Sequence, residues 1–280
     1  DLTIQGNIGL PLTANGFINF SAEHVTSDPT SRGVQRANAQ ELIDAGNTAV
    51  PVPAQRWGNI DSEATRFFVN AEVPATESVT AYAFGNYSES EGESAFFYRS
   101  PVARQDIFAS VPLSSSPGGP RFSFSEQFPG GFTPQFGAEI QDISMVLGAR
   151  GELASGLTFD VSGRSAQNKM SYRISNTVNP SLGPDSPTSF KPGEIRQREA
   201  GVNADFTFPF QLASLASPLN VAFGAEYRRE TYELQAGDVA SWTAGPFSRV
   251  FDPDTNQTVG LAVGSSGFPG ISPDAAGSFS

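Results

Sequence analysis

The stretch that decides the fold is GLTFDVSGR, residues 156–164. Its apolar and polar side chains alternate strictly, with Leu157, Phe159 and Val161 set against Thr158, Asp160, Ser162 and Arg164. A period of two is that of a β-strand with one apolar and one polar face. The same alternation recurs along the chain and predicts about eight strands. The sequence therefore indicates an all-β protein.

The predicted strands form four pairs. They lie at residues 2–22, 66–88, 143–164 and 199–228. Within a pair the turn is about four to eight residues, whereas the connections between pairs run to about 20–50 residues, far beyond the usual loop of a compact domain. The long connections are expected at about residues 26–63, 89–141 and 175–194, and residues 235–280 are read as a final loop. Residues 37–45 fit one short helix within a loop.

Composition narrows the class of protein. Charged residues make up 16% of the chain, fewer than the ~25% of a typical soluble domain. The longest apolar runs are too short for a transmembrane helix, which needs about 20 residues. The absence of cysteine excludes disulfides and thiol chemistry. A net charge of −12 disfavours nucleic acid as a partner.

Short turns at one end of a sheet and long loops at the other are typical of bacterial outer-membrane barrels. The predicted strands have about the 9–11 residues that a tilted membrane-crossing strand needs. We therefore predict an antiparallel up-and-down transmembrane β-barrel segment, with four hairpins, short periplasmic turns and long extracellular loops. The apolar face would meet lipid and the polar face would line the lumen. The return strand at 78–88 carries aromatics on both faces, so its outward face stays open.

Aromatic residues near the predicted strand ends fit an interfacial girdle. They are Phe97, Tyr98, Phe206, Phe208, Tyr227 and Tyr232. The alternative is that Phe and Tyr are simply good strand formers.

With the short turns in the periplasm, both chain ends fall on the extracellular side. A complete bacterial barrel keeps both ends in the periplasm. We therefore expect residues 1–280 to be an internal part of a larger barrel. A complete eight-stranded barrel is the competing interpretation.

Several runs resemble the barrel of TonB-dependent outer-membrane receptors. They are residues 14–23, 79–88, 156–164, 219–230 and 264–270. The resemblance covers most of the chain but rests on the general residue pattern of these runs rather than on an invariant motif. It implies a barrel of about 22 strands around a plug. It also implies location in the outer membrane, contact with outer-membrane lipid and lipopolysaccharide, and uptake of a scarce nutrient such as an iron chelate, cobalamin or an oligosaccharide, energised through TonB. The plug, the TonB box and the C-terminal strands of that family are not found in this sequence, so isolated transport activity is in doubt.

The polar face of the predicted strands supplies the candidates for ligand contact. They are Arg150, Arg164, Asn203, Asp205, Glu226 and Arg228, named because they face the predicted lumen. Trp57 and Trp242 lie in predicted outer loops. Either tryptophan is a candidate for stacking on a sugar ring or an aromatic chelate, and either fits a packed loop anchor equally well.

Catalysis, metals and cofactors find little support in the sequence. His24 is the single histidine, so neither a histidine triad nor a multi-histidine metal site can be built. The run from Asp252 resembles the start of a calcium loop but has Gln257 and Val263 where that loop needs Gly and Glu. We expect no enzyme activity, no cofactor and no metal. Two other functions stay open, an energy-independent porin or small barrel, and a soluble β-sandwich or adhesin module.

Overall fold

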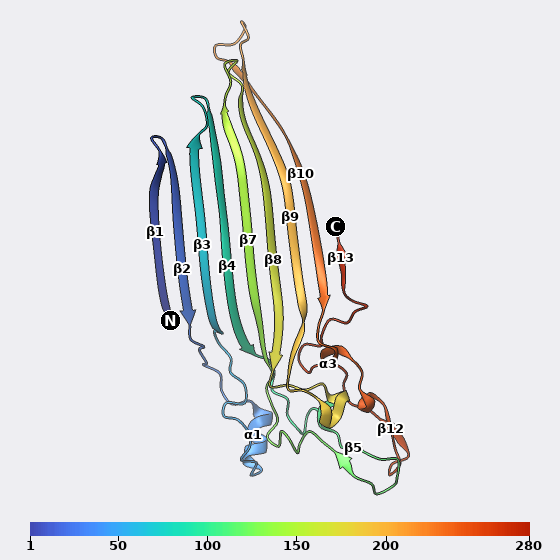
Figure 1. The fold of residues 1–280 in the computed structure, drawn as a ribbon. Helices are drawn as coiled ribbons and strands as arrows, with labels where there is room; N and C mark the ends of the chain where they lie inside the picture. Colours follow the sequence, from blue (N-terminus) through green and yellow to red (C-terminus); the bar gives the residue numbers. More distant parts are fainter.

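A computed structural model describes all residues 1–280. Its main feature is one antiparallel sheet in which strands adjacent in the chain lie side by side (Figure 1). In hydrogen-bonding order the strands are β1 (Leu2–Thr13), β2 (Gly16–Ser27), β3 (Asp61–Pro74), β4 (Val79–Ala95), β7 (Gln135–Glu152), β8 (Thr158–Ser175), β9 (Ser189–Phe210), β10 (Leu219–Ala236) and β13 (Gly277–Phe279). The mostly-β, antiparallel class is confirmed.

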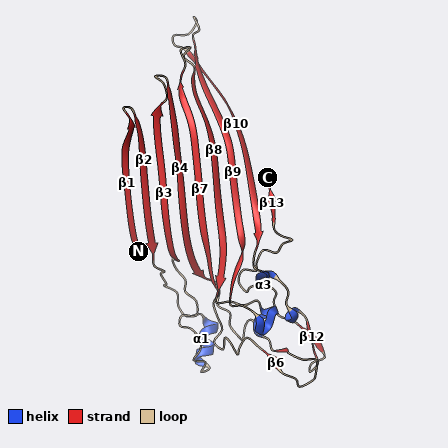
Figure 2. Cartoon of the chain, in the orientation of Figure 1, coloured by secondary structure: helices blue, strands red, loops and turns tan.

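All four hairpin turns lie at one end of the sheet, and the long connections gather at the other end (Figures 1 and 2). We call the connecting segments 28–60, 96–134, 176–188 and 237–276 the loop layer. It contains α1 (Ala37–Asp44), α2 (Gln105–Phe108), α3 (Val239–Trp242), two 3-10 turns (Pro180–Asp185 and Pro246–Ser248), the ribbon of β5 (Val111–Pro112) with β6 (Arg121–Phe122), and the ribbon of β11 (Val250–Asp252) with β12 (Gln257–Val259). The expected short helix at 37–45 is confirmed as α1. None of the helices combines the length and the apolar character that crossing a bilayer requires.

Strand register separates polar from apolar side chains. Arg150 lies opposite Asp160, and Asp160 lies opposite Asp205, so these polar residues share one face of the sheet. Leu147 lies opposite Ala83 and belongs to the other face. We call these the polar face and the apolar face. The register also answers the question left open for β4: Tyr82 and Phe84 lie on the polar face, whereas Tyr87 lies on the apolar face beside Phe67 and Ile143.

The apolar face carries a continuous band of hydrophobic side chains, which we call the apolar belt. It includes Ile8 and Leu10 on β1, Ile18 and Phe20 on β2, Phe67, Val69, Ala71 and Val73 on β3, Ala83 and Tyr87 on β4, Ile143, Met145 and Leu147 on β7, Val161 on β8, Val202 and Phe206 on β9, and Leu219, Val221, Phe223 and Tyr227 on β10. Many of these side chains are exposed, among them Val202 at 54% and Phe223 at 57%.

The strands are longer than the sequence suggested. The predicted length of about 9–11 residues is wrong, because the eight long strands have between 12 and 22 residues. β4 continues to Ala95 and β7 begins at Gln135, so the connection predicted at 89–141 shrinks to 96–134. The physical reason is that the pattern changes near the loop layer. On β4 both faces are polar from Glu89 to Ser94, and on β7 the alternation reverses, with Phe136, Ala138 and Ile140 on the polar face. Backbone pairing continues there although the alternation of the belt does not.

The expected final loop at 235–280 is also corrected. β10 runs to Ala236, and Gly277–Phe279 returns to pair with it as β13. The residues between them form α3 and the β11–β12 ribbon. Three-residue strands contain too few positions to show a period of two, which is why the sequence did not reveal them.

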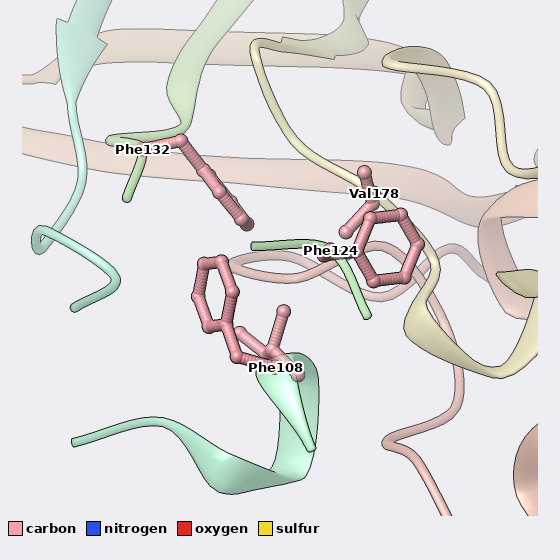
Figure 3. Packing of buried hydrophobic residues seen from close by; sticks show 5 residues of the cluster. Phe108, Phe124, Phe132 and Val178 are labelled. Carbon is pink, nitrogen blue, oxygen red and sulfur yellow. The ribbon is translucent and has the colours of Figure 1, made fainter. Parts of the chain in front are cut away.

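Both hydrophobic clusters sit in the loop layer, and the sheet contributes only separate buried side chains such as those of Ala64, Ile174 and Phe190. One cluster joins Ile107, Phe108, Phe124, Phe132 and Val178, all at most 3% exposed (Figure 3). A second joins Ala39, Val50, Ala54 and Tyr98. Because members of each cluster come from different connections, the connections hold one another in place.

Candidate ligand-contacting face and loop layer

All six predicted lumen residues lie on the polar face. Their side chains are engaged with one another or with neighbouring strands. Arg164 makes ion pairs with Glu199 at 2.5 Å and with Glu226. Arg150 pairs with Glu72 at 2.5 Å. The polar face is therefore a lattice of opposite charges rather than a set of free ionic groups.

The remaining candidates are bonded more locally. The side-chain amide of Asn203 donates to Asp205 at 2.5 Å, and Arg228 pairs with Glu230 of its own strand at 3.5 Å. Both contacts join residues two apart on one strand, which share a face. Because surface pairs of this kind are weak, contributing about 0–1 kcal/mol, a polar ligand can replace them at small cost.

Tyr82 adds an aromatic element to the polar face. Its hydroxyl donates to Asp160 at 2.6 Å, and the Arg150 guanidinium lies 5.5 Å from the centre of its ring. The ring lies over Gly148 of β7, where an added Cβ would stand 2.3 Å from a ring carbon. Glycine at this position is thus required by the close approach of the ring. Sequence reasoning missed Tyr82 because the aromatics of β4 occur on both faces.

The two tryptophans have different environments. Trp57 is 58% exposed, and its ring lies 5.5 Å from that of Phe97. The Arg36 guanidinium lies 5.6 Å from the centre of the Phe97 ring, which makes an exposed stacking surface of Arg36, Phe97 and Trp57. Trp242 is partly buried in α3 and donates its indole N–H to the Gly237 carbonyl at 3.2 Å. Trp57 therefore remains a ligand candidate, and Trp242 is a loop anchor.

The expected aromatic girdle is corrected at two positions. Tyr98 is buried in the loop layer, where its hydroxyl donates to the Gly130 carbonyl at 2.5 Å. Burial raises the pKa of this phenol. Tyr232 lies on the polar face, opposite Gln197. Tyr227, by contrast, lies on the apolar face and is 68% exposed.

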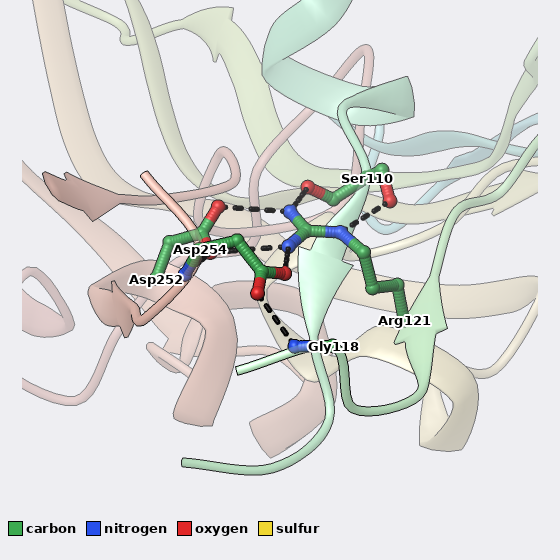
Figure 4. A network of polar contacts seen from close by, with 5 residues as sticks. All are labelled: Ser110, Gly118, Arg121, Asp252 and Asp254. Atoms are coloured by element: carbon green, nitrogen blue, oxygen red, sulfur yellow. Dashed lines mark hydrogen bonds and ion pairs between the residues drawn. The ribbon is translucent and has the colours of Figure 1, made fainter. Parts of the chain in front are cut away.

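An ionic clamp in the loop layer was not foreseen. Arg121 of β6 contacts both carboxylate oxygens of Asp252 at 3.1 and 2.9 Å, and Asp254 at 3.0 Å (Figure 4). Asp254 also accepts from the backbone N–H of Gly118 at 2.6 Å. Asp252 is 2% exposed, and the hydrogen bonds from Arg121 lower its pKa to about 2. The run from Asp252 thus binds a guanidinium 131 residues away, a separation at which no sequence pattern joins the partners.

The last connection folds over the loop end of the polar face. The ring of Phe268 lies 4.8 Å from that of Phe136 on β7 and 5.1 Å from that of Tyr172 on β8. The buried Arg99 donates to the Ser266 hydroxyl at 3.1 Å and to the Phe97 carbonyl at 3.0 Å. Burial lowers the pKa of this guanidinium. A ligand that approaches the polar face from this end therefore meets the loop layer first.

The structure offers no group of three or more His, Asp or Glu side chains suited to holding a metal ion. No protein-family model matches the chain, and no curated protein matches it. A function for the chain therefore has to be argued from the polar face, the apolar belt and the loop layer.

Proposed function

We propose that the chain is the barrel part of an outer-membrane receptor that takes up a scarce nutrient, with energy supplied through TonB. The observation that carries this proposal is the apolar belt. A sheet that exposes large hydrophobic side chains along all its long strands needs a nonaqueous neighbour, because soluble proteins rarely expose large contiguous apolar patches. Lipid is the neighbour that fits a belt across a whole sheet.

The position of the belt supports lipid over a protein partner. Its limit on the loop side lies at Phe67 on β3 and at Tyr227 on β10. Tyr227 is in the register row of Ala71, so the limit has moved toward the turns by about four residues. The limit on the turn side moves in the same direction, from Val73 on β3 to Leu219 on β10. A band of constant height across tilted strands shifts in this way, and barrel strands are tilted by about 35–45°.

The height of the belt also fits a membrane. On β10 it runs from Leu219 to Tyr227, about nine residues, close to the 9–11 that cross a bilayer in a tilted strand. An exposed tyrosine at its limit fits the aromatic girdle of such barrels. Closure of the sheet into a barrel belongs to this proposal, because lipid leaves no tolerance for an open sheet edge.

Ligand capture would begin in the loop layer, at the exposed surface of Trp57 and Phe97. The nutrient would then meet the polar face. There the paired charges of Arg150, Arg164 and Glu226 offer both donors and acceptors to a large polar molecule. Because the contacts they would replace are weak, binding stays reversible, as transport requires.

A second candidate is an energy-independent porin, which the same belt and polar face support equally. The observation that favours a receptor is the folded loop layer, with its own hydrophobic cores and the clamp of Arg121 with Asp252. A diffusion channel needs a wide mouth, whereas a receptor needs a fixed surface that recognises one ligand.

The test is fractionation of cells that produce the native, full-length protein. We expect it with outer membranes, released only by detergent. Recovery in the soluble fraction would overturn the proposal in favour of a β-sandwich or adhesin. A membrane protein whose uptake activity is unaffected by loss of TonB would leave the barrel standing and favour the porin.

A further inference from the structure

Between the apolar belt and the loop layer, the apolar face becomes charged, and the balance of charge changes sign along the sheet. Strands β3, β4 and β7 carry only acidic groups there, including Glu63, Glu91 and Glu139 in one register row. Strands β8 to β10 carry five basic groups and two acidic ones, Glu194 and Glu233, on the same face. The basic groups are Lys169, Arg173, Arg196, Arg198 and Arg229, which we call the basic sector.

The basic sector is only partly neutralised. Glu194 lies 2.5 Å from Arg196 and 3.5 Å from Lys169, and Arg173 is paired with Glu91 at 2.6 Å. The nearest carboxylate to Arg198 is that of Glu233, at 3.9 Å.

Arg229 is exposed and has no carboxylate partner. The sector is therefore positive, in a chain whose net charge is −12. Its two least neutralised members, Arg198 and Arg229, are also those nearest the belt.

Their height is informative. Arg229 is the next residue on the same face after Tyr227, and Arg198 follows Ala200 in the same way. Both guanidinium groups stand directly beyond the limit of the belt, where the headgroups of the adjoining leaflet begin. Arginine suits phosphate because its fork of N–H groups binds two oxygens at once.

We propose that the basic sector binds the phosphates of a lipid headgroup in the leaflet on the loop side, the phosphorylated glucosamine of lipid A. This inference rests on the proposed barrel function and names a lipid site for it. The separation of charge predicts that the lipid is held beside β8–β10 and not beside β3–β7, where the acidic groups would repel it. A lipid fixed on one side would also fix the orientation of the barrel among its neighbours.

The experiment measures binding of bisphosphorylated lipid A to the full chain in detergent, by native mass spectrometry. The test variant is Arg198→Gln with Arg229→Gln. The control is Arg66→Gln with Arg56→Gln, which also removes two charges, one from the polar face, where Arg66 pairs with Glu23, and one from the exposed Arg56 of the loop layer. We expect the double variant to bind about tenfold or more weakly, and the control to bind as the parent protein does. Dephosphorylated lipid A should bind all three proteins equally weakly.

Equal binding by the double variant and the parent would overturn the site, as would equal binding of the dephosphorylated lipid to the parent. Circular dichroism checks that each variant keeps its β structure. Should the double variant misfold, Arg229→Gln alone decides, because that side chain has no ionic partner to lose. Failure of the barrel proposal is seen separately, as a chain that stays soluble without detergent, and it would remove the lipid site as well.

Discussion

The sheet and the loop layer of this protein are stabilised in opposite ways. The sheet has long runs of backbone hydrogen bonds but almost no buried side chains, and every residue of β1 is exposed. The loop layer has little regular structure, yet it holds the two hydrophobic clusters and the buried Asp252. A connection is usually the least packed part of a domain; here the connections are the most packed.

This difference indicates that the two regions are suited to different surroundings. A sheet without a core on either face has to gain from its surroundings what a soluble sheet gains from burial, and in the proposed function lipid supplies it. The loop layer carries its own core and can hold its shape in water. Changes in one region are therefore expected to leave the other intact.

The largest effect is expected from removing an aromatic ring in the loop layer. Phe124 is 1% exposed and packs edge-on against Phe122 at 4.9 Å. Phe124→Ala should cost about 3–5 kcal/mol of the stability of this layer, because it leaves a cavity. Limited proteolysis should detect new cleavage within 96–134. In the matched control, Phe223→Ala in the apolar belt, the loop layer should resist protease as before; equal cleavage in both would contradict the separation of the two regions.

A charge placed in the apolar belt should destabilise the sheet and leave the loop layer intact. Phe206 lies opposite Phe223 in the middle of the belt, and its neighbour Thr207 lies on the polar face opposite Ala222. Phe206→Arg should destabilise the protein in lipid vesicles by about 2–4 kcal/mol, the cost of an arginine near the bilayer midplane. Urea titration of the vesicle-folded protein measures it. Thr207→Arg, on the same face as Asp205, is the control and should fold almost as well; comparable losses would mean that the apolar face does not meet lipid.

The sequence predicted the sheet well where the belt is, because there most of the apolar side chains keep to one face of each strand. The alternation around Phe159 placed the hairpins and assigned the six candidate polar-face residues to one face. Beyond the belt, for example from Glu89 to Glu93, both faces are polar, and the pattern disappears although the strand continues. The ion-pair partners of the six candidate residues depend on the register between strands, which the alternation does not encode.

The organisation of the loop layer was beyond such reasoning. Its core joins Phe124 and Phe132, from a segment rich in Gly, Pro and Ser, to Val178 in another connection. Contacts of this kind have no period and no local signature. The same holds for Arg121 and Asp252, whose pairing depends on two ribbons meeting in space.

Breaking that pair gives the next prediction. Arg121→Met keeps an unbranched apolar stem but removes the guanidinium, and so leaves the Asp252 carboxylate buried without its main partner. Loss of one member of a buried pair is strongly destabilising. We expect cleavage between β5 and β12 to become faster by on the order of tenfold, while amide exchange in the sheet is unchanged. Restored protection in Arg121→Met with Asp252→Asn would show that the unpaired charge was the cause; protection unchanged in the single variant would show that the clamp is not needed.

Acid should have the same effect on the parent protein. Folding lowers the pKa of Asp252 from 3.8 to about 2. The stabilisation is therefore complete above the unfolded pKa and is lost as the pH falls toward the folded one. Protection of the loop layer, followed by amide exchange, should be constant from neutral pH down to about 5 and fall between about 4 and 2. A sheet that lost protection in the same window would show that the regions are coupled.

The smallest effect concerns the exposed stacking surface. Trp57→Ala removes one ring of the pair with Phe97, and with it about 0.5–1.5 kcal/mol. Because Trp57 is largely exposed, the loop layer should keep its resistance to protease. Trp242→Ala, the matched variant, should make the loop layer near α3 easier to cleave by protease, since it removes a partly buried side chain that anchors the loop. Ligand affinity of the full receptor, measured calorimetrically, then separates the two roles. If Trp57→Ala binds ligand as the parent does, the exposed ring is not a ligand contact, and recognition must lie on the polar face.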